Sequence, residues 1–130
     1  MSKHYYLAKI LPGAGFDETV AATVEALKAE GFGVLSDIDV SATLKAKLGT
    51  DFRPYRILGA CNPALAHKAL SAEDKIGVML PCNVIVQAVD NGVEVAAVNP
   101  AVAMARVDNP ALAPLAEDVR GRLARVIDAL

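Results

Sequence analysis

Two alternating apolar segments joined by Asp90-Asn91-Gly92 constrain the fold more than any other feature of the chain. Residues 76–89 read IGVMLPCNVIVQAV and residues 93–98 read VEVAAV. Alternation of this kind is typical of strands with one buried face, and Asn-Gly between two such runs is a strong hairpin signal. The sequence therefore predicts an antiparallel hairpin with Asn91-Gly92 as its two-residue loop.

The hairpin register predicts which residues face the core. With that loop, Ala88 lies opposite Val95, and one face carries only small and aliphatic residues: Val84, Val86, Ala88, Val95 and Ala97. Cys82 continues this face, so we expect its thiol to be buried and inert, whereas Asn83 falls on the other face with Gln87 and Glu94. A bulge at Pro81, which cannot donate to a central ladder, would reverse the assignment.

The rest of the chain alternates predicted strands with predicted helices. Strands are expected at 4–11, 34–40 and 53–61, and helices at 17–30, 41–48, 63–70, a short turn from 100, and a longer segment from 110. The order β-α-β-α-β-α-β-β-α favours an α+β fold, a single two-layer domain over residues 1–130. We expect a mostly antiparallel or mixed sheet with helices packed on one face. The third strand should place Tyr55, Ile57, Gly59 and Cys61 on one face.

Helix starts explain several polar residues that could be taken for a site. Asn-Pro-Ala occurs at 62–64, 99–101 and 109–111. Each Asn can accept from free N–H groups, and each Pro suits the first helical position. Asp17 and Ser41 are predicted as caps of the first two helices.

Charge and hydropathy exclude several classes of partner. The chain has 13 basic and 15 acidic residues without a basic run, which predicts no nucleic-acid partner. It has no apolar segment of about 20 residues, so we expect no membrane span. The opening residues lack a signal-peptide pattern, so we expect a cytoplasmic protein with reduced thiols. Gly13-Ala14-Gly15 lacks the third glycine of a dinucleotide-binding motif. The sequence therefore predicts no particular cofactor.

The segment GACNPALAHKAL at 59–70 holds the candidate catalytic residues, Cys61 and His67. A thiol just before a helix start can have a lowered pKa. The alternative is that Cys61 is a small buried side chain at the end of a strand. His67, at the edge of the helix's buried side, could equally be a half-exposed residue without a role.

Residue types suggest two further sites, one for zinc and one for an anion. Cys61, His67 and Cys82 would suit tetrahedral zinc, although their spacing matches no zinc motif. Arg56, at the start of the third strand, could bind an anion or pair with a carboxylate; Arg53 has the same two options. The second strand supplies Asp37 and Asp39.

Over essentially its whole length, the chain resembles a bacterial and archaeal family, domain of unknown function 302. The segments YRILGACNP (55–63) and LPCN (80–83) carry the resemblance most specifically. It implies an α+β domain that acts as a homodimer, and a pocket that brings Asn62, Cys82 and Asn83 close to Cys61. The resemblance supplies no activity.

Three functions follow from these residues. The first is binding of a small molecule or ion by a homodimer, with Cys61, Asn62, Cys82, Asn83, Arg56 and His67 as the candidate site. The second is a thiol- or sulfur-redox enzyme using Cys61. The third is a structural or interaction module whose outer hairpin face (Ile85, Val89, Ala96, Val98) packs on another subunit. The sequence leaves open whether the protein is an enzyme.

Overall fold

The computed structural model describes residues 4–130 and confirms the α+β fold. Its strands form one antiparallel sheet in the order β1-β5-β4-β3-β2. The strands are β1 (Tyr6–Pro12), β2 (Gly33–Asp39), β3 (Tyr55–Cys61), β4 (Cys82–Val89) and β5 (Gly92–Val98). The helices are α1 (Phe16–Ala29), α2 (Val40–Leu48), α3 (Pro63–Ala72), α4 (Pro100–Ala103) and α5 (Leu112–Asp128), with a 3-10 helix η1 (Asp74–Met79).

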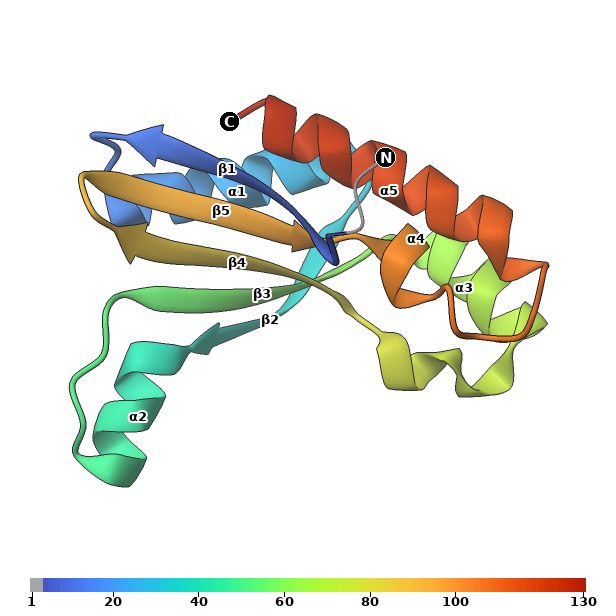
Figure 1. The fold of residues 1–130 in the computed structure, drawn as a ribbon, viewed down its shortest axis with the longest axis horizontal. Helices are drawn as coiled ribbons and strands as arrows, with labels where there is room; N and C mark the ends of the chain where they lie inside the picture. The colour runs from blue at the N-terminus through green and yellow to red at the C-terminus, as the bar shows by residue number, and fades with distance from the viewer. Residues whose placement is uncertain (1–3) are drawn as a thin grey trace.

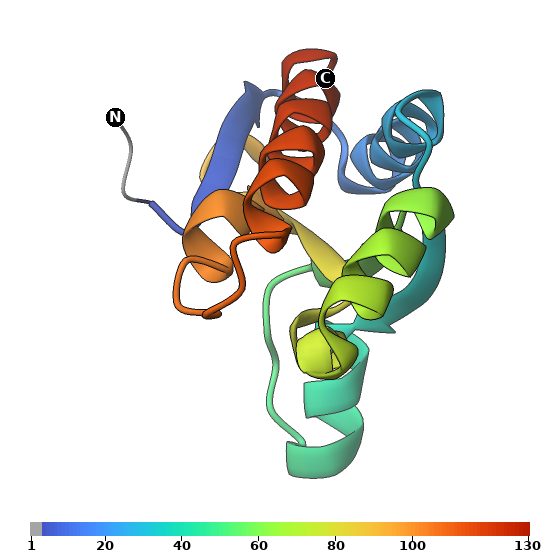
Figure 2. The same cartoon turned by 90° about the vertical axis from the view of Figure 1, so that its right-hand side faces the viewer.

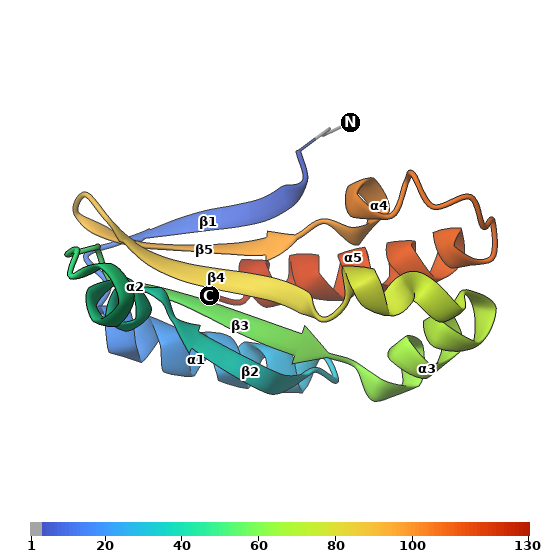
Figure 3. The same cartoon turned by 90° about the horizontal axis from the view of Figure 1, so that it is seen from below.

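The long helices α1 and α5 lie on the same face of the sheet, as the prediction of one helical layer requires (Figures 1 and 3). The main core lies between them and the sheet. Leu58, Val84 and Val95 are fully buried there against Leu27 of α1 and Leu123 of α5. In the part of the chain that the structure describes, no helix is long and apolar enough to span a membrane.

The opposite face of the sheet is not covered by the long helices, and we call it the open face. Strand alternation places these residues on it: Tyr6, Ala8, Ile10, Ile38, Tyr55, Ile57, Asn83, Ile85, Gln87, Glu94, Ala96 and Val98. The short helix α2 projects on this side, beside the edge strand β2 (Figures 1 and 2). Helix α2 has no buried residue.

The predicted hairpin is present, but its register is shifted by two residues. Val89 pairs with Gly92 and Ala88 with Val93, so the loop is Asp90-Asn91 rather than Asn91-Gly92. The neighbouring strand β1 explains the shift. Gly92 also lies beside Pro12, and a Cβ on Gly92 would come within 2.4 Å of the Leu11 carbonyl oxygen. Gly92 is therefore needed inside the sheet, and Asn91 takes the positive φ of the turn.

The prediction of one long strand over 76–89 is wrong in its first half. Residues Asp74–Met79 form η1, and β4 begins only at Cys82. Pro81 has no N–H to donate to a ladder, so the paired strand starts after it. The third strand also starts later than predicted, at Tyr55.

The Asn-Pro segments cap helices or turns as predicted, but two other predicted caps are wrong. Asn62 accepts from the N–H of Leu65 and Asn99 from that of Ala101, while Asn109 Oδ1 accepts from Ala111 N–H just before α5. Helix α1 begins at Phe16 after Gly15, which places Asp17 in its first turn. Helix α2 is capped by Asp39, whose carboxylate accepts from Ala42 N–H and from the Ser41 hydroxyl.

Candidate ligand pocket

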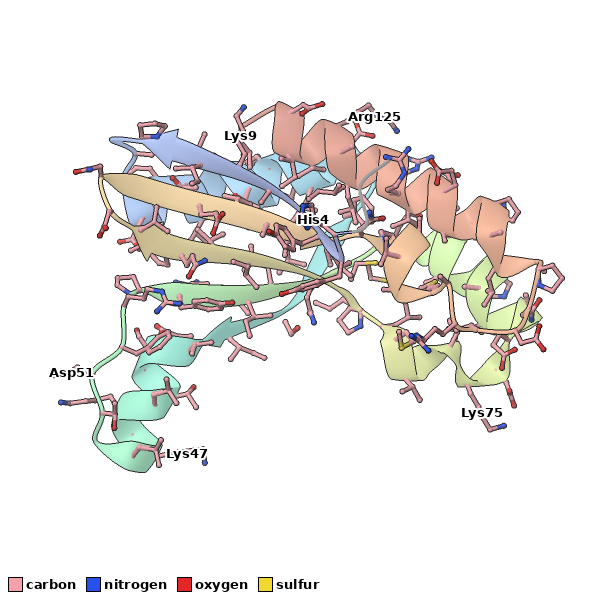
Figure 4. The ribbon with its side chains drawn as sticks, viewed as in Figure 1. His4, Lys9, Lys47, Asp51, Lys75 and Arg125 are labelled. Carbon is pink, nitrogen blue, oxygen red and sulfur yellow. The ribbon has the colours of Figure 1, made fainter. Side chains whose placement is uncertain are left out.

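A cavity of about 350 Å³ lies where β3 and β4 meet the C-terminal helices, and we call it the Cys61 pocket. Its wall is contributed by β2, β3, α3, η1, β4, α4 and α5. The lining residues are almost all apolar: Phe32, Leu35, Ala60, Cys61, Asn62, Leu65, Ala66, Ala69, Leu70, Gly77, Leu80, Pro81, Cys82, Pro100, Met104, Leu112, Leu115, Ala116 and Val119. Lys75 of η1 points outward into solvent (Figure 4).

Small side chains on two helices leave the space that the pocket occupies. On α3, the alanines Ala66 and Ala69 line the pocket, and on α5 Ala116 does so. A buried Leu flanks them on each helix, Leu65 and Leu112. Because alanine fills little volume, the two helices surround the cavity with aliphatic walls without filling it.

Both cysteines line this pocket. Cys82 pairs with Ala60, so Cys61 is the next residue along β3. Cys61 is half-buried and Cys82 is 9% exposed, as predicted for a side chain in an apolar layer. Burial, and secondarily the nearby Cys61, raises the pKa of the Cys82 thiol to about 11. Cys82 is therefore protonated at neutral pH, which opposes a role as a thiolate nucleophile.

Cys61 does not stay on the face predicted from the alternation of β3. Tyr55 lines a hollow on the open face, whereas Cys61 lines the Cys61 pocket together with Cys82. Cys61 is the last residue of β3, and α3 begins two residues later. The alternation therefore stops predicting the direction of a side chain where the strand gives way to the helix.

Asn62 is the polar side chain of the pocket wall, and its oxygen is already engaged. Its Oδ1 accepts from the N–H of Leu65 at 3.2 Å, which caps α3. Its Nδ2 lies against Gly31, where a Cβ would approach it to 2.9 Å, and Gly31 has a φ of +86°. A glycine at position 31 therefore both makes the turn after α1 and leaves room for the Asn62 amide.

His67 is exposed on α3 and does not line the pocket. Within residues 4–130, no three His, Cys, Asp or Glu side chains gather so that they could hold a metal ion. The structure therefore does not bring Cys61, His67 and Cys82 together as the zinc hypothesis requires, because the two cysteines line the pocket and His67 does not.

Asn83 and Arg56 also lie apart from the pocket. Asn83 lines a hollow on the open face, on the other side of the sheet from Cys82. Arg56 is near the start of β3, where its Nε donates to Asp37 Oδ1 at 2.7 Å. This pairing lowers the pKa of Asp37. Of the predicted ligand-binding residues, Asn62 and Cys82 share the pocket with Cys61, whereas Asn83 and Arg56 do not.

Most of the pocket wall was not identified from the sequence. Leu65 comes from α3, whereas Met104, Leu112 and Ala116 come from the end of α4 and from α5, about 40 residues later in the chain. The available signal was the small-residue pattern on α3, where Ala66 and Ala69 lie three residues apart on one side of the helix. That pattern predicts a close approach or a space, but it does not predict which other helix completes the wall.

Comparison with known proteins places the chain in one family. A family model described as "Domain of unknown function DUF302" matches residues 9–130. A crystal structure of an uncharacterized conserved protein DUF302 from Bacillus stearothermophilus is similar over 96% of this chain and 97% of that one. The two share 32% sequence identity, with a TM-score of 0.88. No curated protein matches the chain.

Proposed function

The chain belongs to the DUF302 family, and we propose that it binds a small apolar molecule in the Cys61 pocket. The observation that carries this proposal is a cavity lined almost wholly by aliphatic side chains, with two thiols and one amide on its wall. Ligand sites are typically concave, mostly apolar and equipped with few polar groups. The Cys61 pocket has all three properties.

The volume and chemistry of the pocket limit the class of ligand. At about 350 Å³ it lies near the lower end of the range for small-molecule sites, which is about 300–1,000 Å³. No Lys, Arg, Asp or Glu is among its lining residues. Transfer of an ion into such a site would lack a compensating charge. The proposal therefore keeps the small-molecule part of the sequence prediction and replaces an ion by a neutral, mainly apolar ligand.

A neutral fluorescent probe, N-phenyl-1-naphthylamine, tests this proposal. Ala66→Phe would place an aromatic ring in the pocket, whereas Ala64→Phe adds the same ring at an exposed position of the same helix. We expect saturable binding to the wild type and to Ala64→Phe, with at least a tenfold loss of affinity in Ala66→Phe. Equal affinities in the two variants, or no saturable binding to the wild type, would contradict the proposal.

Thiol chemistry at Cys61 is the second candidate function, supported by the position of this residue. Cys61 is half-buried at the pocket wall and directly precedes the cap of α3. Alkylation with iodoacetamide over a range of pH, mapped to each cysteine by mass spectrometry, gives the apparent pKa of Cys61. A value well below the usual thiol range would favour this candidate, and an ordinary value would favour simple binding.

The homodimer implied by the family resemblance is a further part of the proposal. It is supported by the sheet face that the long helices leave uncovered. Assembly through that face would not close the Cys61 pocket, because the pocket lies on the helical side of the sheet with Leu65 and Ala116.

A further inference from the structure

An unbroken apolar row crosses all five strands on the open face of the sheet. Neighbouring residues of the row are directly paired across each strand boundary, in the order Ala8, Ala96, Ile85, Ile57 and Ile38. An antiparallel sheet with one face toward water normally alternates apolar residues inward with polar residues outward. The open face breaks this pattern at its centre, as a surface that meets another protein does.

Apolar surface continues on both sides of this row. On the edge strand β1, Tyr6 and Ile10 flank Ala8 and are 37% and 55% exposed. At the other edge, Ile38 itself is 47% exposed. Between these edges the face is hollowed, with a volume of about 460 Å³ lined in part by Tyr55 and Ile85. The patch therefore spans the full width of the sheet.

We infer that the open face binds the open face of a second copy of this chain, with a two-fold axis along β4. This inference rests on the homodimer proposed above, for which it names the surface and the axis, and it is independent of ligand binding in the Cys61 pocket. β4 is the middle strand of the sheet. Rotation about it places Ala96 against the partner's Ile57 and Ala8 against the partner's Ile38. Small side chains on one half of the row thus meet large ones on the other half, which makes the row complementary to itself.

Charges on the open face are arranged with the same symmetry. Arg53 Nε donates to Gln87 Oε1 at 2.9 Å, and Gln87 Nε2 donates to Glu94 Oε1 at 2.8 Å. This polar line therefore has a cation on the β3 side of β4 and a carboxylate on the β5 side. The rotation about β4 exchanges the two sides, so each Arg53 approaches the partner's Glu94. Complementary charges of this kind fix the orientation of an interface.

The projecting helix α2 has a place in the same arrangement. It stands beside β2 on the open side and has no buried residue (Figure 2). Its Leu48 is 71% exposed, and its Leu44 is only half-buried. The rotation brings the partner's β1 edge next to β2 and α2. The exposed side chain of the partner's Ile10, which the strand register places at the same end of the sheet as α2, then approaches α2.

The patch supplies more than half of the area that a stable dimer needs. Five strands spaced about 4.8 Å apart are about 24 Å wide, and seven residues of strand are about 20 Å long. The product is a flat area of about 480 Å². The uneven surface of the side chains and the two α2–β1 contacts of the dimer add to this area. Stable interfaces bury about 800 Å² on each partner. The sheet supplies most of that area.

Sedimentation equilibrium of the full chain tests this dimer. We expect a mass twice the 13.6 kDa of the chain for the wild type. Ile85→Glu places a charge at the centre of the row and should weaken dimerisation at least 100-fold. Val78→Glu is the matched control, because Val78 is an aliphatic residue that is 85% exposed on η1, away from the open face. It should leave the dimer intact. A monomeric wild type, or a folded Ile85→Glu variant that dimerises normally, would overturn the inference.

Cross-linking locates the axis even if Ile85→Glu fails to fold. In a Cys61→Ser background, the remaining native thiol is the buried Cys82. Ile85→Cys lies on the proposed axis strand, so a short bifunctional maleimide should join two copies. Ile10→Cys also lies on the open face, but at the β1 edge. The rotation places residue 10 of one subunit far from residue 10 of its partner. It should not cross-link. Linkage through residue 10 and not through residue 85 would overturn the proposed axis.

Discussion

The two apolar surfaces of this molecule differ in shape and in origin. The Cys61 pocket is a cavity lined mainly by apolar side chains of the helices and of the ends of β3 and β4. The apolar row of the open face is made by the strands alone, through direct register pairs such as Ile57 with Ile85. A concave apolar pocket suits a small ligand, whereas a broad sheet face suits another protein surface. One sheet therefore supports both kinds of apolar surface, one on each of its faces.

The largest expected effect is a difference in stability between variants of two neighbouring β4 residues that lie on opposite faces of the sheet. Val84 is fully buried on the helical side, and Ile85 lies on the open face. Val84→Asp should lower the free energy of unfolding by at least about 4 kcal/mol, because it buries an unpaired charge. Ile85→Asp should cost the monomer less, about 1–2 kcal/mol, because Ile85 is only half-buried.

Urea unfolding followed by circular dichroism measures both effects. Because a dimer gains stability by mass action, the comparison must be made over a range of protein concentrations. Similar losses for Val84→Asp and Ile85→Asp, after that correction, would show that the open face is not a surface of the folded monomer.

A smaller effect concerns the Cys82 thiol. Its pKa rises from 9.0 to about 11 on folding. Below pH 9 the thiol is protonated in both the folded and unfolded states, and its contribution to stability is fully present. As the pH rises from 9 to 11, the unfolded state loses this proton first, so stability falls by about 3 kcal/mol, at 1.36 kcal/mol for each pKa unit.

The pH dependence of unfolding in Cys82→Ala isolates this contribution from other groups that titrate at alkaline pH. Reducing conditions keep the thiols free in both proteins. The wild type should lose stability more steeply than Cys82→Ala between pH 9 and 11. Parallel curves for the two proteins would contradict the burial of Cys82 in the pocket wall.

The smallest expected changes in stability concern two residues of the segment GACNPALAHKAL, the capping residue Asn62 and the exposed residue His67. Asn62→Ala removes the cap of α3 and should cost about 1 kcal/mol of stability. His67→Ala changes an exposed side chain outside the pocket and should alter stability by less than about 0.5 kcal/mol. Thermal unfolding of the two variants checks this order. A larger loss for His67→Ala would mean that His67 has contacts essential to α3.

Much of the sheet could be predicted from the sequence, because its information is local. The alternation in β4 assigned Cys82 to the buried face and Asn83 to the other, and both assignments are confirmed. They hold although the hairpin register was wrong, since a shift of two residues keeps every side chain on its face. The register itself depended on the packing of Gly92 beside Pro12, which is a contact between distant segments.

The pocket was less predictable, because its wall is assembled by tertiary packing. The grouping of Asn62 and Cys82 with Cys61 followed from the family resemblance, not from spacing. Arg56 and Asn83 were predicted to join them but lie elsewhere. Arg56 is near the other end of β3 from Cys61, and Asn83 is on the opposite face of β4 from Cys82. Met104, directly after the short helix α4, also lines the pocket, and no local pattern predicts the position of that helix.

Methyl NMR of the full chain, titrated with N-phenyl-1-naphthylamine, shows directly which of the two apolar surfaces binds the probe. The pocket contributes the methyl groups of Leu65, Met104 and Leu115, and the open face contributes those of Ile57 and Ile85. We predict that the probe shifts the Leu and Met signals of the pocket and leaves the two Ile signals unchanged. Shifts confined to Ile57 and Ile85 would contradict ligand binding in the Cys61 pocket, since the probe would then bind the sheet face.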